Sequence, residues 1–122
     1  MREILFRGKR ADNGEWVYGY FYEDIGSFIK ERASSVSTNT HLVDPSTVGQ
    51  YTWLTDKNGR RIFEGDVVEY REYGNLAVAC DDGAFQLERE YTFYDTLDHY
   101  STRFSVVIGN IYDNPELLEE KE

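Results

Sequence analysis

Two histidines and one cysteine are the side chains of this sequence best suited to nucleophilic chemistry. His41 and His99 are far apart in the chain, and Cys80 is the single thiol. A histidine beside a cysteine can activate the thiol as a nucleophile. Cys80, however, falls on the inward side of a predicted strand, where a cysteine behaves as a small apolar residue. We therefore assign Cys80 to the core and predict no Cys/His catalytic pair.

Acidic residues offer two possible metal sites. Asp95, Asp98 and His99 have side chains that can bind metals, but no further motif precedes them. Residues 56–59, Asp-Lys-Asn-Gly, are similar to the start of a calcium loop. Such a loop needs a glycine at its sixth position and a glutamate at its twelfth, and this chain has neither there. We predict a β-turn at 56–59 and no metal site.

Four more carboxylates lie near predicted turns. Glu64 and Asp66 flank a glycine, and Asp81 and Asp82 are adjacent. Paired carboxylates act as acid and base when their pKa values are pushed apart, but turn acids at the rim of a sheet are the simpler interpretation. No glycine-rich phosphate loop, nucleophile elbow or zinc spacing is present. We predict no catalytic residues, no cofactor and no enzyme activity.

An aromatic row is the strongest candidate for a binding site. Trp16, Tyr18, Tyr20 and Tyr22 alternate with other residues, so they share one face of a predicted strand. Such a row can stack on bases or sugars, or pack against strands or a second subunit. A small domain has one core and can cover only one face of this strand. We therefore predict an interface and a homo-oligomer, the alternative being that residues 24–42 fold over the row.

Charge limits the choice of partner. The net charge is −10: residues 1–61 carry nine Lys/Arg against eight Asp/Glu, whereas residues 62–122 carry four against fifteen. This excess of acid disfavours nucleic acid. It permits a head-to-tail self-contact, a basic host protein, or a surface that mimics DNA. No apolar run reaches the roughly 20 residues that span a bilayer. We expect a cytoplasmic protein with no membrane contact.

The elements that would position these residues are mostly strands. Three alternating segments within residues 66–90 are separated by two glycine turns and predict a β-meander. We predict a mainly β fold with an SH3-like small barrel at 53–118, an N-terminal β portion at 1–52 and a short C-terminal helix near Pro115, as a single domain over 1–122. Helical turns are expected within residues 91–101. The predicted shared core contains Val68, Tyr70, Leu76, Val78, Cys80, Phe85, Leu87, Val106 and Ile108.

Three blocks of sequence resemble the YopX-like family of phages and prophages. The first joins residues 6–9 (Phe-Arg-Gly-Lys) with 16–19 (Trp-Val-Tyr-Gly). The second joins 43–52 (Val-Asp-Pro-Ser-Thr-Val-Gly-Gln-Tyr-Thr) and 56–59 with 62–68 (Ile-Phe-Glu-Gly-Asp-Val-Val). The third is 107–118 (Val-Ile-Gly-Asn-Ile-Tyr-Asp-Asn-Pro-Glu-Leu-Leu). The resemblance implies a mainly β fold with an SH3-type part and no established activity, so no functional residues carry over.

One position departs from the family pattern. The family usually has glycine where this chain has Trp53. This leaves open whether the backbone keeps a conformation that glycine takes readily.

Two classes of function follow from these observations. The favoured one is a small non-enzymatic protein of a phage or prophage that self-assembles or binds a host protein. The alternatives are a nucleic-acid-binding module in which Tyr18, Tyr20 and Tyr22 stack on bases, and an acidic DNA mimic that inhibits a host protein.

Overall fold

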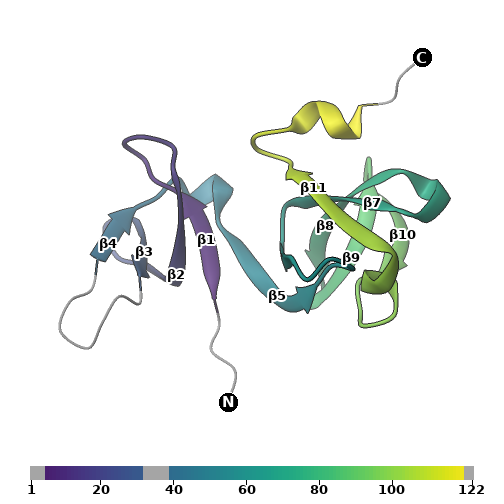
Figure 1. Cartoon of the computed structure of the whole chain (residues 1–122). Helices are drawn as coiled ribbons and strands as arrows, with labels where there is room; N and C mark the ends of the chain where they lie inside the picture. The colour runs from purple at the N-terminus through teal and green to yellow at the C-terminus, as the bar shows by residue number, and fades with distance from the viewer. Residues whose placement is uncertain (1–4, 32–38, 120–122) are drawn as a thin grey trace. The chain divides into compact units, whose positions relative to one another are not determined.

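Most of the regular structure in this protein is antiparallel β-sheet. The computed structural model describes residues 5–31 and 39–119, and their strands form two antiparallel sheets (Figure 1). The chain divides into two units, Met1–Tyr51 and Thr52–Glu122. Each unit contains its own cluster of buried apolar side chains. The predicted mainly β class is confirmed.

Unit 1 is built around one antiparallel sheet. Its elements are β1 (Phe6–Lys9), β2 (Trp16–Glu23), β3 (Ser27–Glu31), β4 (Asn39–Leu42), the 3₁₀ turn η1 (Pro45–Thr47) and the start of β5 (Gly49–Thr55). The strands lie in the order β4-β3-β2-β1-β5. Val17, Ile29 and Val43 form the buried core, and Phe6, Phe21 and Val48 pack against it. One face of β2 therefore packs against this core.

The Asp44-Pro45-Ser46-Thr47 motif fixes the end of β1. The Asp44 carboxylate accepts a hydrogen bond from the backbone N–H of Ser46 at 3.0 Å and so begins η1. The Thr47 hydroxyl oxygen accepts one from the backbone N–H of Lys9 at 2.9 Å. The motif thus anchors a turn to a neighbouring strand.

Gly19 lets β2 and β3 approach closely. A side chain at this position would collide with the backbone carbonyl of Lys30. Only glycine fits at this position, which lies between Tyr18 and Tyr20 in the sequence. The face of β2 opposite the aromatic row therefore has no side chain at residue 19.

Trp53 keeps the backbone conformation that glycine favours. Its φ is 64°, in the left-handed region, although it is a bulky residue within β5. The Thr52 hydroxyl supports this bend, because it donates to the carbonyl of Ile62 at 2.7 Å and accepts from the N–H of Leu54 at 3.2 Å. Trp53 therefore has a φ in the left-handed region, the conformation in question at this position.

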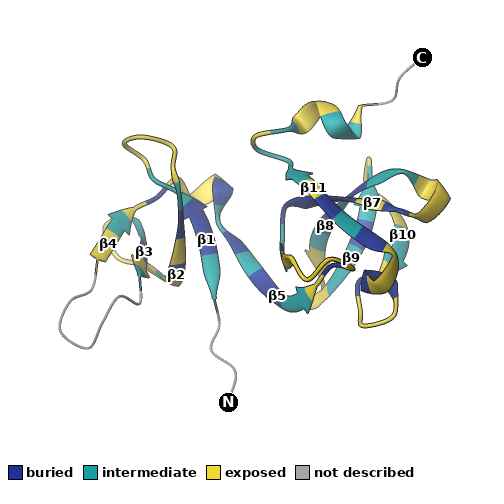
Figure 2. Ribbon diagram, viewed as in Figure 1, coloured by how far each residue is buried: buried dark blue, intermediate teal, exposed yellow. Residues whose placement is uncertain are grey.

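Unit 2 contains the predicted meander. After β6 (Arg61–Phe63), its elements are β7 (Asp66–Tyr70), η2 (Arg71–Tyr73), β8 (Asn75–Asp81), β9 (Ala84–Arg89), β10 (Thr92–Thr96), η3 (Ser101–Phe104), β11 (Ser105–Asn110) and η4 (Pro115–Leu118). The second sheet has the order β10-β9-β8-β7-β11. Figure 2 shows buried residues along β7 and β11. Val78 is buried at 2% exposure whereas Ala77 and Ala79 are half-buried, so the predicted register of β8 is confirmed.

Most of the predicted core is confirmed, but three members are not. Cys80 is exposed because β8 leaves the core near its hairpin end, where Asp81 pairs with Ala84. Ile108 is 37% exposed and Val106 is half-buried, whereas Val107 is buried. An irregularity in pairing between Val107 and Gly109 belongs to the same strand. In β11 it is therefore Val107, and not the predicted Val106 and Ile108, that is buried in the core.

Two further expectations need correction. Residues 92–96 form β10 rather than helical turns, and helical geometry is limited to the 3₁₀ turn at Ser101–Phe104. The SH3-like barrel is not confirmed, because the sheets are not closed. The C-terminal helix is present as the short 3₁₀ turn η4.

Candidate interaction surface

The aromatic row lies on the face of β2 opposite the core of unit 1. Tyr18, Tyr20 and Tyr22 are 45%, 41% and 42% exposed, while Val17 and Gly19 between them are buried. Trp16 is half-buried, with the Arg7 guanidinium 4.7 Å and the Lys9 ammonium 5.5 Å from the centre of its ring. The structure therefore places the predicted residues side by side, with the three tyrosines facing outward.

Neighbouring strands extend this face. Directly opposite residues of antiparallel strands share a face, and β3 places Lys30 beside Tyr20 and Phe28 beside Tyr22. The rings of Tyr22 and Phe28 stack with centroids 5.4 Å apart. Leu42 of β4 lies opposite Phe28 and is exposed. We call this surface the tyrosine face; it consists of Trp16, Tyr18, Tyr20, Tyr22, Phe28, Lys30 and Leu42.

The charge on this face is of one sign. The register also places Arg7 opposite Tyr18 and Lys9 opposite Trp16. Among the strand residues that the described pairings put on this face, three are basic and none is acidic. An aromatic and basic sheet face suits a ligand with planar or acidic groups.

Residues 24–42 do not fold over the row in the part that the structure describes. Ser27–Glu31 and Asn39–Leu42 form β3 and β4, which continue the sheet beside β2. The intervening residues 32–38 lie outside the described residues. The alternative of an intramolecular cover is therefore not supported by β3 and β4.

Two carboxylates of the shared sequence blocks are bound to the backbone. Asp56 is 6% exposed, and its oxygens accept from the N–H groups of Asn58, Arg60 and Val107, each at 2.9 Å. Asp66 accepts from the N–H of Phe63 at 2.7 Å. Residues 56–59 therefore form the predicted β-turn, and Asp56 also links this turn to β11. Both carboxylates therefore serve to hold the backbone in place.

The residues considered for metal binding have separate partners. The Tyr70 hydroxyl donates to Asp95 at 2.6 Å, and the Asp98 carboxylate accepts from the N–H groups of Tyr100 and Ser101. The backbone N–H of Ser101 holds the pKa of Asp98 below its ordinary value. Burial raises the pKa of Tyr70 to about 12, and the hydrogen bond to Asp95 adds to this effect. Within residues 5–31 and 39–119, no three His, Cys, Asp or Glu side chains are grouped as a metal site.

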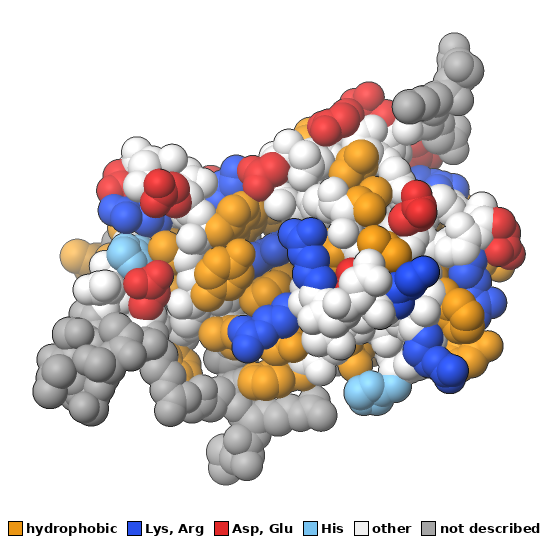
Figure 3. All heavy atoms as spheres, viewed as in Figure 1, with side chains coloured by type: hydrophobic (Ala, Val, Ile, Leu, Met, Phe, Trp, Pro, Cys, Tyr) orange, Lys and Arg blue, Asp and Glu red, His pale blue; other side chains and the backbone are white. Residues whose placement is uncertain are grey.

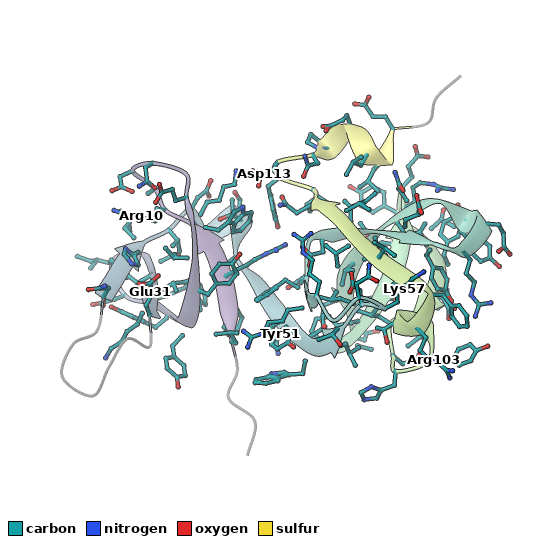
Figure 4. The ribbon with its side chains drawn as sticks, in the orientation of Figure 1. Arg10, Glu31, Tyr51, Lys57, Arg103 and Asp113 are labelled. Carbon is teal, nitrogen blue, oxygen red and sulfur yellow. The ribbon has the colours of Figure 1, made fainter. Side chains whose placement is uncertain are left out.

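The candidate nucleophile and bases also have separate partners among the described contacts. His41 lies in unit 1, where its Nε2 is 3.2 Å from Glu31 Oε2, while Cys80 and His99 belong to unit 2. Cys80 pairs with Phe85 across a hairpin, and the carbonyl of His99 accepts from the Thr102 hydroxyl. Glu31, the partner of His41, is labelled in Figure 4 and belongs to β3 of unit 1. The hydrogen bonds described here do not assemble a Cys/His pair.

Sequence reasoning missed an aromatic cluster in unit 2. The Arg71 guanidinium lies 3.9 Å from the centre of the Phe104 ring, which meets Tyr100 edge to face. At the β9–β10 turn, Tyr91 is 99% exposed and Phe93 is 56% exposed. Phe93, Leu97 and Tyr100 have helical spacing in the sequence, so nothing in the sequence indicated that Phe93 lies on the surface of a sheet. Phe93 lies opposite Glu88 and is thus on a sheet surface.

These features define a small mainly β protein with an exposed aromatic sheet face in unit 1 and a second aromatic surface in unit 2. The chain belongs to the YopX protein family, which matches residues 5–119. The family resemblance of the three sequence blocks is thereby confirmed.

A solved structure shares this fold. The chain is similar to the crystal structure of protein EF1440 from Enterococcus faecalis, with 26% sequence identity and a TM-score of 0.60. The similarity covers 98% of this chain and 100% of that one. Comparison with curated protein sequences gave no match. In the described part of the chain, no helix is long and apolar enough to cross a membrane.

Proposed function

We propose that this chain is a small non-enzymatic interaction protein that self-associates through the tyrosine face. The observation that carries the proposal is the row of three outward tyrosines on a sheet whose other face packs on the core. Tyrosine combines a large apolar ring with a polar tip, and it is enriched at the centres of protein interfaces.

The size of the exposed patch supports this role. A buried aromatic side chain covers about 150–250 Å², so three tyrosines that are over two-fifths exposed present on the order of 250 Å². Phe28 and Leu42 continue the same surface. The largest apolar patch on a typical monomer is about 300–600 Å² and often functional. With the 52% exposed Leu42 added to the three tyrosines, the tyrosine face reaches about the lower end of this range.

The charge of unit 1 supports self-association as well. Unit 1 contains six Lys/Arg and seven Asp/Glu, whereas unit 2 contains seven and sixteen. Two copies of unit 1 therefore repel each other mainly through the few basic side chains of the face, whereas two copies of unit 2 repel each other through a large excess of acidic groups. The setting we propose is a phage or prophage protein in the cytoplasm, with a host protein as a further partner.

Sedimentation velocity of a matched pair of variants tests the proposal. Tyr20→Glu places a charge at the centre of the face and is expected to convert multimers to a species near 14.3 kDa. Tyr100→Glu makes the same replacement at a more exposed tyrosine of unit 2 and should leave the multimers intact. Multimers that survive Tyr20→Glu, or that are split equally by both variants, contradict the proposed face.

A second candidate function, binding of single-stranded nucleic acid, is favoured by one observation. The tyrosine face combines stacking residues with Lys30, while Lys9 and the buried Arg7 lie beside it on β1, and the described pairings add no carboxylate. The overall charge of −10 opposes this function. Fluorescence anisotropy with labelled oligo-dT distinguishes nucleic-acid binding from self-association alone. Binding that weakens steeply with salt and is lost in Tyr20→Glu supports nucleic acid, and absence of binding at low salt excludes it.

A further inference from the structure

Unit 2 has an apolar groove between its sheet and the C-terminal 3₁₀ turn. The groove has a volume of about 430 Å³ and is lined by Ala77, Glu88, Tyr91, Ile111, Pro115 and Leu118, among others. A hydrogen bond from the Asn75 side-chain amide to the carbonyl of Leu117, at 2.9 Å, ties η4 to β8 beside it. The small side chain of Ala77 leaves space over the sheet, while Ile111, Pro115 and Leu118 supply an apolar wall.

A strained turn holds an aromatic ring at the end of this groove. Glu90 and Tyr91 have φ values of 52° and 64°, which only glycine and asparagine adopt readily. The ring of Tyr91 is 99% exposed, so it gains no burial that would offset the unfavourable backbone. Strain of this kind is concentrated at functional sites. Phe93, also exposed, lies opposite Glu88 and so faces the same side of the sheet as the groove.

The rim of the groove is acidic. Glu88 and Glu90 border it, and Figure 3 shows further acidic side chains at η4, where Glu116 and Glu119 are exposed. Arg89 also lines the groove, but its guanidinium is bound to the protein, since it donates to the carbonyls of Tyr73 and Asn75 and to the hydroxyl of Tyr94. The net charge of unit 2, with sixteen acids against seven bases, adds to the same field.

We propose that this groove binds a peptide segment of another protein in which an apolar side chain is flanked by lysine or arginine. The apolar side chain enters between Ala77 and Leu118, Tyr91 covers it, and the flanking cations meet Glu88 and Glu90. Complementary charge and one buried anchor are the usual requirements of such recognition. The chain's own C-terminal residues are a poor occupant, because three of residues 119–122 are glutamate.

Synthetic peptides test the proposal with the whole protein. The probe is a labelled peptide of alternating leucine and lysine, compared with a serine-lysine peptide of equal charge and a leucine-glutamate peptide. Glu88→Gln with Glu90→Gln is expected to weaken binding of the leucine-lysine peptide by about tenfold. The matched control, Asp81→Asn with Asp82→Asn, removes the same charge from the adjacent hairpin and should change affinity less than twofold.

Three results would overturn the proposal. They are equal binding of the leucine-lysine and serine-lysine peptides, equal losses in the two double variants, and unchanged binding in Tyr91→Ala. Circular dichroism of each variant confirms folding, and Tyr91→Ala removes a ring that is exposed, so its fold should persist. Peptide binding and self-association are tested separately. Self-association is measured from the mass of Tyr20→Glu in the absence of peptide, so either proposal can fail without the other.

Discussion

Removal of the Asp56 carboxylate should destabilise unit 2 more than any other change to a single acid described here. Three backbone N–H groups donate to this carboxylate at 2.9 Å, one of them from Val107 in a buried strand. Hydrogen bonds to a charged group contribute about 1.5–3 kcal/mol each, and their losses are not additive. We expect Asp56→Ala to lower the free energy of unfolding by about 3–5 kcal/mol, and Asp56→Asn by about 1–3 kcal/mol.

Urea unfolding followed by tryptophan fluorescence measures this change. Asp81→Ala is the control, because Asp81 is exposed in a hairpin, and it should alter stability by less than about 0.5 kcal/mol. If Asp56→Ala is too unstable to study, Asp56→Asn keeps one acceptor and remains measurable. A loss below about 1 kcal/mol in Asp56→Ala would refute the assignment of this carboxylate as a backbone anchor.

The remaining predictions concern the core, a tyrosine and a turn of unit 2. Leu76→Ala or Val78→Ala removes a fully buried side chain and should cost about 1–4 kcal/mol in urea unfolding, whereas Ala79→Gly on the other face should cost less. The pKa of Tyr70 is raised to about 12, so its stabilising contribution is complete below pH 10 and is lost as the pH rises through 12. Ultraviolet titration of Tyr70→Phe should therefore lose the ionisation step at the highest pH. Loss of an ionisation step near pH 10 instead would contradict this assignment. Glu90→Asn with Tyr91→Gly should raise the melting temperature while it weakens binding of the leucine-lysine peptide, because the turn is relieved and the ring removed.

The meander could be predicted from the sequence because its local signals agree. Alternation places Leu76 and Val78 on one face, and the glycine turns fix the hairpins, so the buried residues of β7, β8 and β9 were largely identified. The outward row of Tyr18, Tyr20 and Tyr22 followed from the same periodicity. Both results depend on short-range geometry, to which sequence patterns are most sensitive.

The parts that could not be predicted depend on irregular pairing or on where a strand ends. Nothing in Val106-Val107-Ile108 indicates which residue faces the core, so the irregular pairing at Gly109 was missed. Cys80 has the composition of a core residue but lies where β8 extends past the core. The left-handed turn at Glu90 and Tyr91 uses residues that rarely adopt it, which concealed both β10 and the groove beside it.

The mass of the unmodified protein in solution tests the central claim most directly. Light scattering at moderate salt should give a mass of at least twice 14.3 kDa at micromolar concentrations, falling towards the monomer on dilution. A mass near 14.3 kDa across the whole micromolar range would contradict self-association through the tyrosine face.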